Sequence, residues 1–362
     1  MRLRFFYKNA YLRKRFPKSF LMKRSAFIKN TLVSTAGLLI TKNLMRPVPG
    51  QVYGQNGMTY QLNTNWGNLN SDQTPVNDCH EMIQDGKGRI LLLTNETKNN
   101  VIVYNKSGRL LESWGTEFPG AHGLTVQHNG KEDLLFITDT NRHQVYKTTI
   151  TGKILLTIDP PSDLPAYAKK EAFVPTETTV LTNGEFYIAD GYGAQHILHY
   201  DEKGKLKNVF GGKGTGDENL DNAHGICVDY RNPKPTLIIT DRTRNAFKRF
   251  SMEGKLLEVI HLPGACVCRP VIKGDYLYAA VLRSPNLDTV NSGFVTILDK
   301  DNKVVSNLGG SAPVYENDVL QPMSQMEKIF IHPHDVCVDD EGSIYVAQWA
   351  SGKVYPYKFT KV

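Results

Sequence analysis

Four of the ten histidines occupy the same position in a repeated sequence unit. If the repeats surround one axis, these imidazoles converge, and they would repel one another if they were protonated. A transition metal removes this conflict, because three neutral imidazoles and one open position form a Lewis-acid site. The shared register therefore predicts a metal centre, whereas any single histidine taken alone fits an ordinary core or surface residue. The four short segments are Cys-His80-Glu-Met, Ala-His122-Gly-Leu, Ala-His224-Gly-Ile and Pro-His334-Asp-Val.

Each histidine opens a unit of two predicted strands joined by a turn, and six copies of this unit are present. In two copies the histidine position is taken by Thr176 and by a residue at about Cys266. A second unit consists of a turn followed by a strand, and five copies recur at spacings of 44 to 52 residues. Its turn residues tolerate the positive φ of tight hairpins. They are Gly108, Gly152, Gly204, Gly254 and Asn302.

Short strands that repeat every 40 to 50 residues are typical of a propeller with four-stranded blades. The sequence therefore predicts an all-β, six-bladed β-propeller over residues 53–362. Five outer-strand units serve six blades, so one outer strand is missing. The segment from Met58 to Leu62 resembles such a strand, and we expect it to pair with the C-terminal blade and close the ring.

The net charge of +7 is concentrated at the N-terminus. Residues 1–46 contain twelve Lys and Arg and no acid, so the rest of the chain has a net charge of −5. Nucleic acid is therefore not an expected partner of the propeller. Hydrophobic content of 40% excludes a disordered chain, and no apolar stretch approaches the ~20 residues of a membrane span. We expect a monomer that acts on a small-molecule or peptide substrate.

Residues 1–49 have the order of an export signal: a basic region, a mild apolar run and prolines. The segment Lys-Arg24-Ser25-Ala-Phe-Ile-Lys resembles a twin-arginine signal, but Ser25 replaces the second arginine, which favours the general export route. We expect residues 1–49 to be removed and the protein to be periplasmic or secreted, with Met1 or Met22 as the start. The alternative is a basic amphipathic helix that the mature protein retains. The five cysteines form no predicted disulfide.

The histidine motifs resemble those of the lyase domain of peptidylglycine α-amidating enzymes, a six-bladed propeller of NHL repeats. The resemblance extends over about residues 75–360. That family cleaves a peptidyl-α-hydroxyglycine into a peptide amide and glyoxylate, with a zinc ion held by three histidines and a tyrosine as general base. The segments that carry it are Phe-Pro-Gly-Ala-His122-Gly-Leu, Ile-Ala-Asp190-Gly-Tyr192-Gly, Asn-Ala-His224-Gly-Ile and His-Pro-His334-Asp335-Val.

The resemblance implies a role for individual residues. His122, His224 and His334 would hold zinc, His80 is an additional possible ligand, and Tyr192 would act as the base. The family also has a structural calcium ion, whose ligands would be the backbone carbonyls of Met82 and Leu124 and the side chain of Asp335. The alternative for Tyr192 is a packed loop aromatic.

The chain departs from the family at two positions. The family's catalytic arginine is absent, because the end of the first blade's second strand reads Leu-Thr94-Asn-Glu, and Gly193 replaces a disulfide cysteine beside the tyrosine. Arg242, Arg244 and Arg269 are possible substitutes for the missing charge. These departures favour a changed substrate over peptide amidation.

The reaction that we expect is metal-assisted cleavage of a C–O or C–N bond in a small hydroxylated substrate. Two alternatives stay open at this point. One is a non-enzymatic NHL-repeat propeller that binds a ligand or protein. The other is a calcium-dependent lactonase or sugar hydrolase on the same fold.

Overall fold

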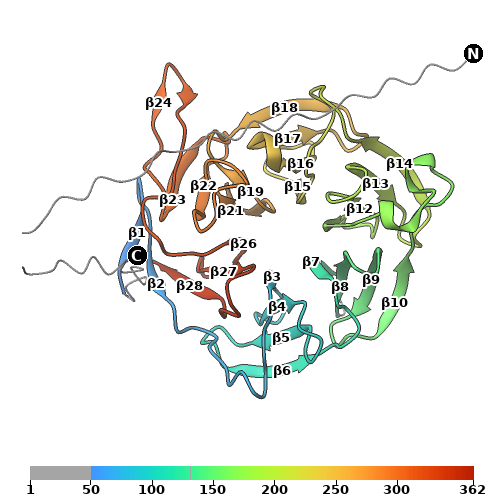
Figure 1. Cartoon of the computed structure of the whole chain (residues 1–362), viewed down its shortest axis with the longest axis horizontal. Helices are drawn as coiled ribbons and strands as arrows, with labels where there is room; N and C mark the ends of the chain where they lie inside the picture. Colours follow the sequence, from blue (N-terminus) through green and yellow to red (C-terminus); the bar gives the residue numbers. More distant parts are fainter. Residues whose placement is uncertain (1–49, 131) are drawn as a thin grey trace, which may run out of the picture. The chain divides into compact units, whose positions relative to one another are not determined.

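The computed structural model describes residues 50–130 and 132–362 of this protein, and antiparallel sheets surround a central axis (Figure 1). The export signal predicted for residues 1–49 lies outside the described residues. Five sheets have four main strands, and the sixth adds two N-terminal strands to three C-terminal ones. The prediction of a six-bladed β-propeller is confirmed.

Each of the first three blades runs along the chain from an inner to an outer strand. Blade 1 comprises β3 (Cys79–Gln84), β4 (Ile90–Thr94), β5 (Val101–Tyr104) and β6 (Leu110–Trp114). Blade 2 comprises β7 (Ala121–His128), β8 (Asp133–Asp139), β9 (Gln144–Thr149) and β10 (Ile154–Ile158). Blade 3 comprises β11 (Glu177–Val180), β12 (Phe186–Ala189), β13 (His196–Tyr200) and β14 (Leu206–Gly211).

The other three blades continue this order, with an interrupted inner strand in blade 5. Blade 4 comprises β15 (Ile226–Asp229), β16 (Thr236–Asp241), β17 (Ala246–Phe250) and β18 (Leu256–His261). Blade 5 comprises β19 (Cys266–Val267), β20 (Val271–Lys273), β21 (Tyr276–Arg283), β22 (Phe294–Leu298) and β23 (Val304–Leu308). Blade 6 comprises β26 (Pro333–Val338), β27 (Ile344–Gln348), β28 (Tyr357–Lys361), β2 (Met58–Asn63) and β1 (Val52–Gln55).

Short elements lie between the blades. They are the hairpin of β24 (Tyr315–Glu316) and β25 (Val319–Leu320), and three 3-10 helices, η1 (Pro165–Tyr167), η2 (Lys170–Ala172) and η3 (Arg242–Arg244). The described residues include no helix with the length and hydrophobicity that a bilayer span requires.

The ring is closed by pairing between the two ends of the described chain. Strand β2 pairs antiparallel with β28, with Leu62 opposite Phe359, as the sequence predicts. Strand β1 adds a further strand outside β2. The inner strands of neighbouring blades are in contact around the ring, from β3 through β7, β11, β15 and blade 5 to β26 and back to β3. Equivalent residues of the six blades therefore meet at the axis.

The turns and the core follow from the residue types. Gly108, Gly152, Gly204, Gly254 and Asn302 all have positive φ, from 60° to 92°, as the turn prediction requires. Apolar side chains from adjacent blades pack together and form the core between the blades. One such cluster joins blades 6 and 1. All five cysteines are free in the structure.

Candidate metal centre

Local irregularities in the inner strands place three of the four histidines. The register between β3 and β4 shifts from Cys79 to Glu81, so that His80 is the extra residue. The same irregularity occurs in blade 2 at His122 and in blade 6 at His334. Bulges of this kind re-aim a side chain and are frequent next to active sites. His224 instead lies just before β15.

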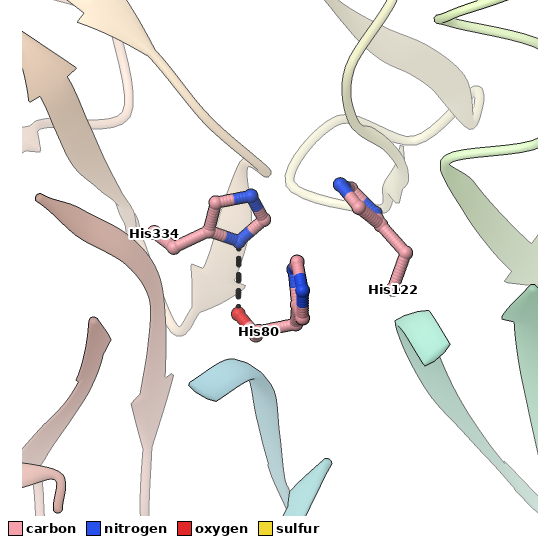
Figure 2. A group of neighbouring side chains, drawn as sticks. All are labelled: His80, His122 and His334. Carbon is pink, nitrogen blue, oxygen red and sulfur yellow. Dashed lines mark hydrogen bonds between the residues drawn. The ribbon is translucent and has the colours of Figure 1, made fainter. Parts of the chain in front are cut away.

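The four imidazoles form one buried cluster at the axis. Their ring centroids are 4.7–4.9 Å apart for the pairs 80–122, 80–334, 122–224, 122–334 and 224–334. Each of the four residues is at most 6% exposed. Figure 2 shows three of them, His80, His122 and His334, converging from different blades. The shared register therefore brings all four side chains together.

Hydrogen bonds to backbone carbonyls orient two of these rings. His122 Nδ1 lies 2.9 Å from the carbonyl oxygen of Thr176, and His334 Nδ1 lies 3.0 Å from that of His80. When Nδ1 carries the proton, the lone pair of Nε2 is available to a ligand. His334 Nε2 also lies 3.1 Å from His224 Nε2, so two ring nitrogens face each other across the axis.

Burial keeps the imidazoles neutral. It lowers the pKa of His80 from 6.5 to about 3. It also lowers the pKa of His122, His224 and His334 well below the usual value, and neighbouring positive groups reinforce this effect. A neutral imidazole is the form that binds a metal ion.

The residues present fit a metal ion. One ligand atom each from His80, His122 and His334 lie within 4.8 Å of one another, so this buried group could hold a metal. Nδ1 of His80 and Nδ1 of His224 are buried without a hydrogen-bond partner, and a donor set made only of imidazole suits Zn, Cu, Fe or Ni. This group includes His80 and not His224, whose Nε2 instead faces Nε2 of His334.

Tyr192 lies at the open side of this cluster, on the turn after β12. Its hydroxyl oxygen is 3.1 Å from His122 Nε2, and its ring contacts those of His122 and His224. The residue is 42% exposed, so its ring borders solvent while its hydroxyl faces the histidines. Desolvation raises the pKa of Tyr192, and the charge of Arg242 offsets part of this rise.

The turn that carries Tyr192 is held by Asp190, whose carboxylate accepts hydrogen bonds from the N–H of Val174 and Ala194. A Cβ on Gly193 would overlap the carbonyl oxygen of Ala172 and the Asp190 carboxylate. The loop therefore cannot accommodate the cysteine that the family has at this position without moving.

Of the three arginines considered as substitutes for the missing charge, only Arg242 reaches the histidines. It follows β16, is 2% exposed, and its Nη2 lies 3.2 Å from Cys268 Sγ. Its charge lowers the pKa of both His122 and His224. Arg244 instead pairs with Asp241 at 3.0 Å. The sequence signal for Arg242 is its place directly after the aspartate that ends a blade's second strand.

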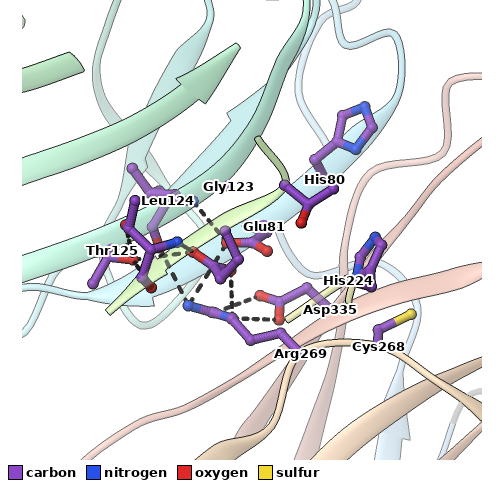
Figure 3. A network of polar contacts seen from close by, with 12 residues as sticks. His80, Glu81, Gly123, Leu124, Thr125, His224, Cys268, Arg269 and Asp335 are labelled. Carbon is purple, nitrogen blue, oxygen red and sulfur yellow. Dashed lines mark hydrogen bonds and ion pairs between the residues drawn. The ribbon is translucent and has the colours of Figure 1, made fainter. Parts of the chain in front are cut away.

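Arg269 occupies the position that the resemblance assigns to calcium (Figure 3). Its guanidinium donates to the carbonyl oxygens of Met82 (2.9 Å) and Leu124 (3.2 Å) and binds both carboxylate oxygens of Asp335 (3.0 and 2.8 Å). These are the three expected calcium ligands. The site does not fit calcium in this protein, because the guanidinium of Arg269 already binds all three of the expected ligands.

The equivalent of the histidine position in blade 5 is Cys268, not Cys266. Arg269 meets Asp335 at the axis and therefore corresponds to it, which places Cys268 in register with His334. The sequence motif fails here because Pro270, which cannot donate to the strand ladder, separates β19 from β20.

Comparisons with known proteins agree with this architecture. Residues 175–311 match a protein family described as a 6-bladed beta-propeller. A gluconolactonase from Xanthomonas campestris has a similar fold, with a TM-score of 0.56, 11% sequence identity, and coverage of 87% of this chain and 98% of that chain.

Two curated relatives match by sequence. "Peptidyl-alpha-hydroxyglycine alpha-amidating lyase 2" of Drosophila melanogaster is 38% identical over 112 residues, or 30% of this chain and 27% of that protein. "Probable peptidyl-alpha-hydroxyglycine alpha-amidating lyase pgal-1" of Caenorhabditis elegans is 30% identical over 141 residues, or 37% and 36%. The match spans about a third of each relative's length. Over these segments the chain is homologous to peptidyl-α-hydroxyglycine α-amidating lyases, as the motifs predict.

Proposed function

We propose that this protein is a metal-dependent lyase that cleaves a C–O or C–N bond in a small hydroxylated substrate. The observation that carries the proposal is the convergence of four buried imidazoles beside a tyrosine hydroxyl that lies 3.1 Å from His122 Nε2. The homology to α-amidating lyases supports the same reaction class. The metal that we propose is zinc, which takes imidazole ligands and needs no redox partner.

Zinc bound by these histidines would act as a Lewis acid on a substrate oxygen. Tyr192 would take the proton of the substrate hydroxyl; the 3.1 Å contact of its own hydroxyl with His122 Nε2 supports this role. As that O–H bond breaks, a C=O bond forms, the adjacent C–N or C–O bond breaks, and the leaving atom takes a proton. Arg242, whose charge lowers the pKa of His122 and His224, would supply a positive charge to a carboxylate or developing oxyanion.

The charge of Arg242 also bears on the substrate. We propose that Arg242, from blade 4, takes the role of the arginine that the family has in blade 1. A substrate with a hydroxyl and a carboxylate on one carbon fits a site with a metal, a phenol and a guanidinium. We propose a substrate smaller than a peptide. A peptide that ends in α-hydroxyglycine is nevertheless the first compound to test, because it carries a hydroxyl and a carboxylate on one carbon.

The experiment has two stages. Metal analysis of the purified protein should give about one zinc per chain, and His122→Ala should lose it. The zinc-loaded protein should then release glyoxylate from a peptidyl-α-hydroxyglycine. Zinc without glyoxylate release would rule out the amidating reaction but leave the metal site.

A substitution separates the base from the metal ligands. Tyr192→Phe should keep its zinc and lose roughly 10²–10⁴-fold in turnover, the usual contribution of general base catalysis. Tyr230→Phe is the matched control, because Tyr230 is exposed and outside the site, and it should retain full activity. Equal activity in Tyr192→Phe would remove Tyr192 from the mechanism.

The two alternatives predict other results. Absence of bound metal would favour a binding propeller. A requirement for calcium would favour a lactonase, but the acids at the axis, Glu81 and Asp335, are engaged by Arg269. We also propose that residues 1–49 direct export to the periplasm or outside the cell; loss of export on deleting them would support this.

A further inference from the structure

A second polar cluster lies next to the histidines along the axis. In blades 1, 3, 5 and 6 the residue directly after the histidine position is charged: Glu81, Glu177, Arg269 and Asp335. All four are buried, at most 8% exposed. We refer to these four residues as the axial ion cluster.

Six oxygen atoms surround the guanidinium of Arg269. Four accept hydrogen bonds: both oxygens of Asp335 and the carbonyls of Met82 and Leu124, at 2.8–3.2 Å. The other two are carboxylate oxygens of Glu81, 3.7 Å away, and Glu177, 3.6 Å away. Carboxylates and carbonyls arranged around one point are the ligands of a hard cation such as Ca²⁺.

Arg269 is the only Lys or Arg found within ion-pair distance of these carboxylates in the described part of the chain. Two carboxylate oxygens, Glu81 Oε1 and Glu177 Oε2, are buried without a hydrogen-bond partner. The cluster thus has more acceptor oxygens than the planar guanidinium satisfies. A spherical cation at the same place could contact the remaining oxygens as well.

A cavity borders the cluster, and neither Tyr192 nor any of the four axial histidines is among the residues that line it. This cavity of about 430 Å³ is lined by Arg269 together with Met82, Val126, Lys273 and Asp340. A hydrated ion could therefore reach the cluster without passing the histidines.

We propose that Arg269 is a built-in replacement for a divalent cation, and that removal of its guanidinium converts Glu81, Glu177, Asp335 and two carbonyls into a divalent-cation site. The protein with Arg269 in place needs no calcium, because the guanidinium pairs with Asp335, lies within 3.7 Å of Glu81 and Glu177, and links blades 1, 2 and 6 to blade 5. This inference does not depend on the proposed lyase activity.

The test compares melting temperatures in EDTA and in calcium. The natural protein should change by less than about 1 °C. Arg269→Ala in EDTA should melt roughly 6–10 °C lower, because three buried carboxylates lose their partner. Calcium about a hundredfold above its Kd should raise that temperature by about 5 °C, and calorimetry should give one Ca²⁺ per chain. Arg269→Ala combined with Asp335→Asn should lose this response.

Arg249→Ala is the matched control. Arg249 is also buried and pairs with Asp229 and Glu258, but no backbone carbonyl joins its contacts. It should be destabilised without any response to calcium. If Arg269→Ala folds only when calcium is supplied, the proposal is supported.

Three results would overturn the proposal. The first is one-to-one calcium binding by the natural protein that Asp335→Asn abolishes. The second is a folded Arg269→Ala that binds no calcium. The third is failure of Arg269→Ala to fold with calcium present, because the ion should replace the lost charge.

Discussion

Acidification of the metal-free protein should destabilise it through His80. Burial lowers the pKa of this side chain from 6.5 to about 3 in the folded state. Because the unfolded chain binds the proton more tightly, the stability present above pH 6.5 is lost as the pH falls toward 3. At about 1.4 kcal/mol per pH unit the full loss is roughly 5 kcal/mol, of which about 3 kcal/mol falls between pH 6.5 and pH 4.

The assay is chemical denaturation between pH 4 and 7.5 with a chelator present, on the natural protein and on His80→Gln. Other groups contribute opposite slopes: burial raises the pKa of Asp190 to about 6, so this carboxylate favours folding at low pH. The quantity to follow is therefore the difference between the two proteins, which isolates His80.

The difference in unfolding free energy between the natural protein and His80→Gln should be constant above pH 6.5. Between pH 6.5 and pH 4 the natural protein should lose about 3 kcal/mol more stability than His80→Gln. Thr176→Val is the matched control, because Thr176 holds the same position in blade 3 and does not titrate. It should change the stability without changing the slope. If the difference between the natural protein and His80→Gln stays flat across this range, His80 is not held neutral by burial and the reasoning is refuted.

Two further substitutions test the packing at the axis and the ring closure. Gly225→Ala would place a Cβ 2.5 Å from the Cα of Arg269 and should cost about 1–3 kcal/mol in chemical denaturation. Gly216→Ala should cost less, because its Cβ would meet only the side-chain oxygen of Asn219, at 3.2 Å. Equal costs would refute the close approach at Gly225. Leu62→Ala, in a strand that closes the ring, should cost about 2–5 kcal/mol by the same measurement, and Val52→Ala, 50% exposed, should be nearly neutral; a neutral Leu62→Ala would mean that the closing strand contributes little.

The fold could be predicted because its determinants are local and repeated. A turn residue with positive φ, such as Gly108 or Asn302, marks each blade independently of the rest of the chain. The pairing of the segment Met58 to Leu62 with the C-terminal blade could be predicted as well, since pairing removes an exposed sheet edge; the register, with Leu62 opposite Phe359, came from the structure. The convergence of the histidines followed from the same repeat, because the propeller turns equal positions in sequence into neighbours in space.

The arginines could not be assigned from the sequence, because a long side chain can act far from its own backbone. Arg269 and Arg242 belong to blades 5 and 4, yet Arg269 binds carbonyls of blades 1 and 2. Position in the repeat fixes where a Cα lies and not where a guanidinium ends. The expected calcium site does not fit calcium for this reason. Its ligand atoms are present, but the guanidinium of Arg269, from another blade, is bound to them.

The ion cluster and the histidine cluster are connected through the backbone of the inner strands. Glu81 accepts a hydrogen bond from the N–H of Leu124 (2.7 Å), and Asp335 accepts one from the N–H of Met82 (2.9 Å). Each amide donor lies two residues after a histidine of the metal centre, so these carboxylates fix the spacing between the strands that carry the histidines. The carboxylates hold their positions against mutual repulsion because Arg269 lies between them. The guanidinium of Arg269 therefore helps to set the geometry of the candidate metal centre without contacting its histidines.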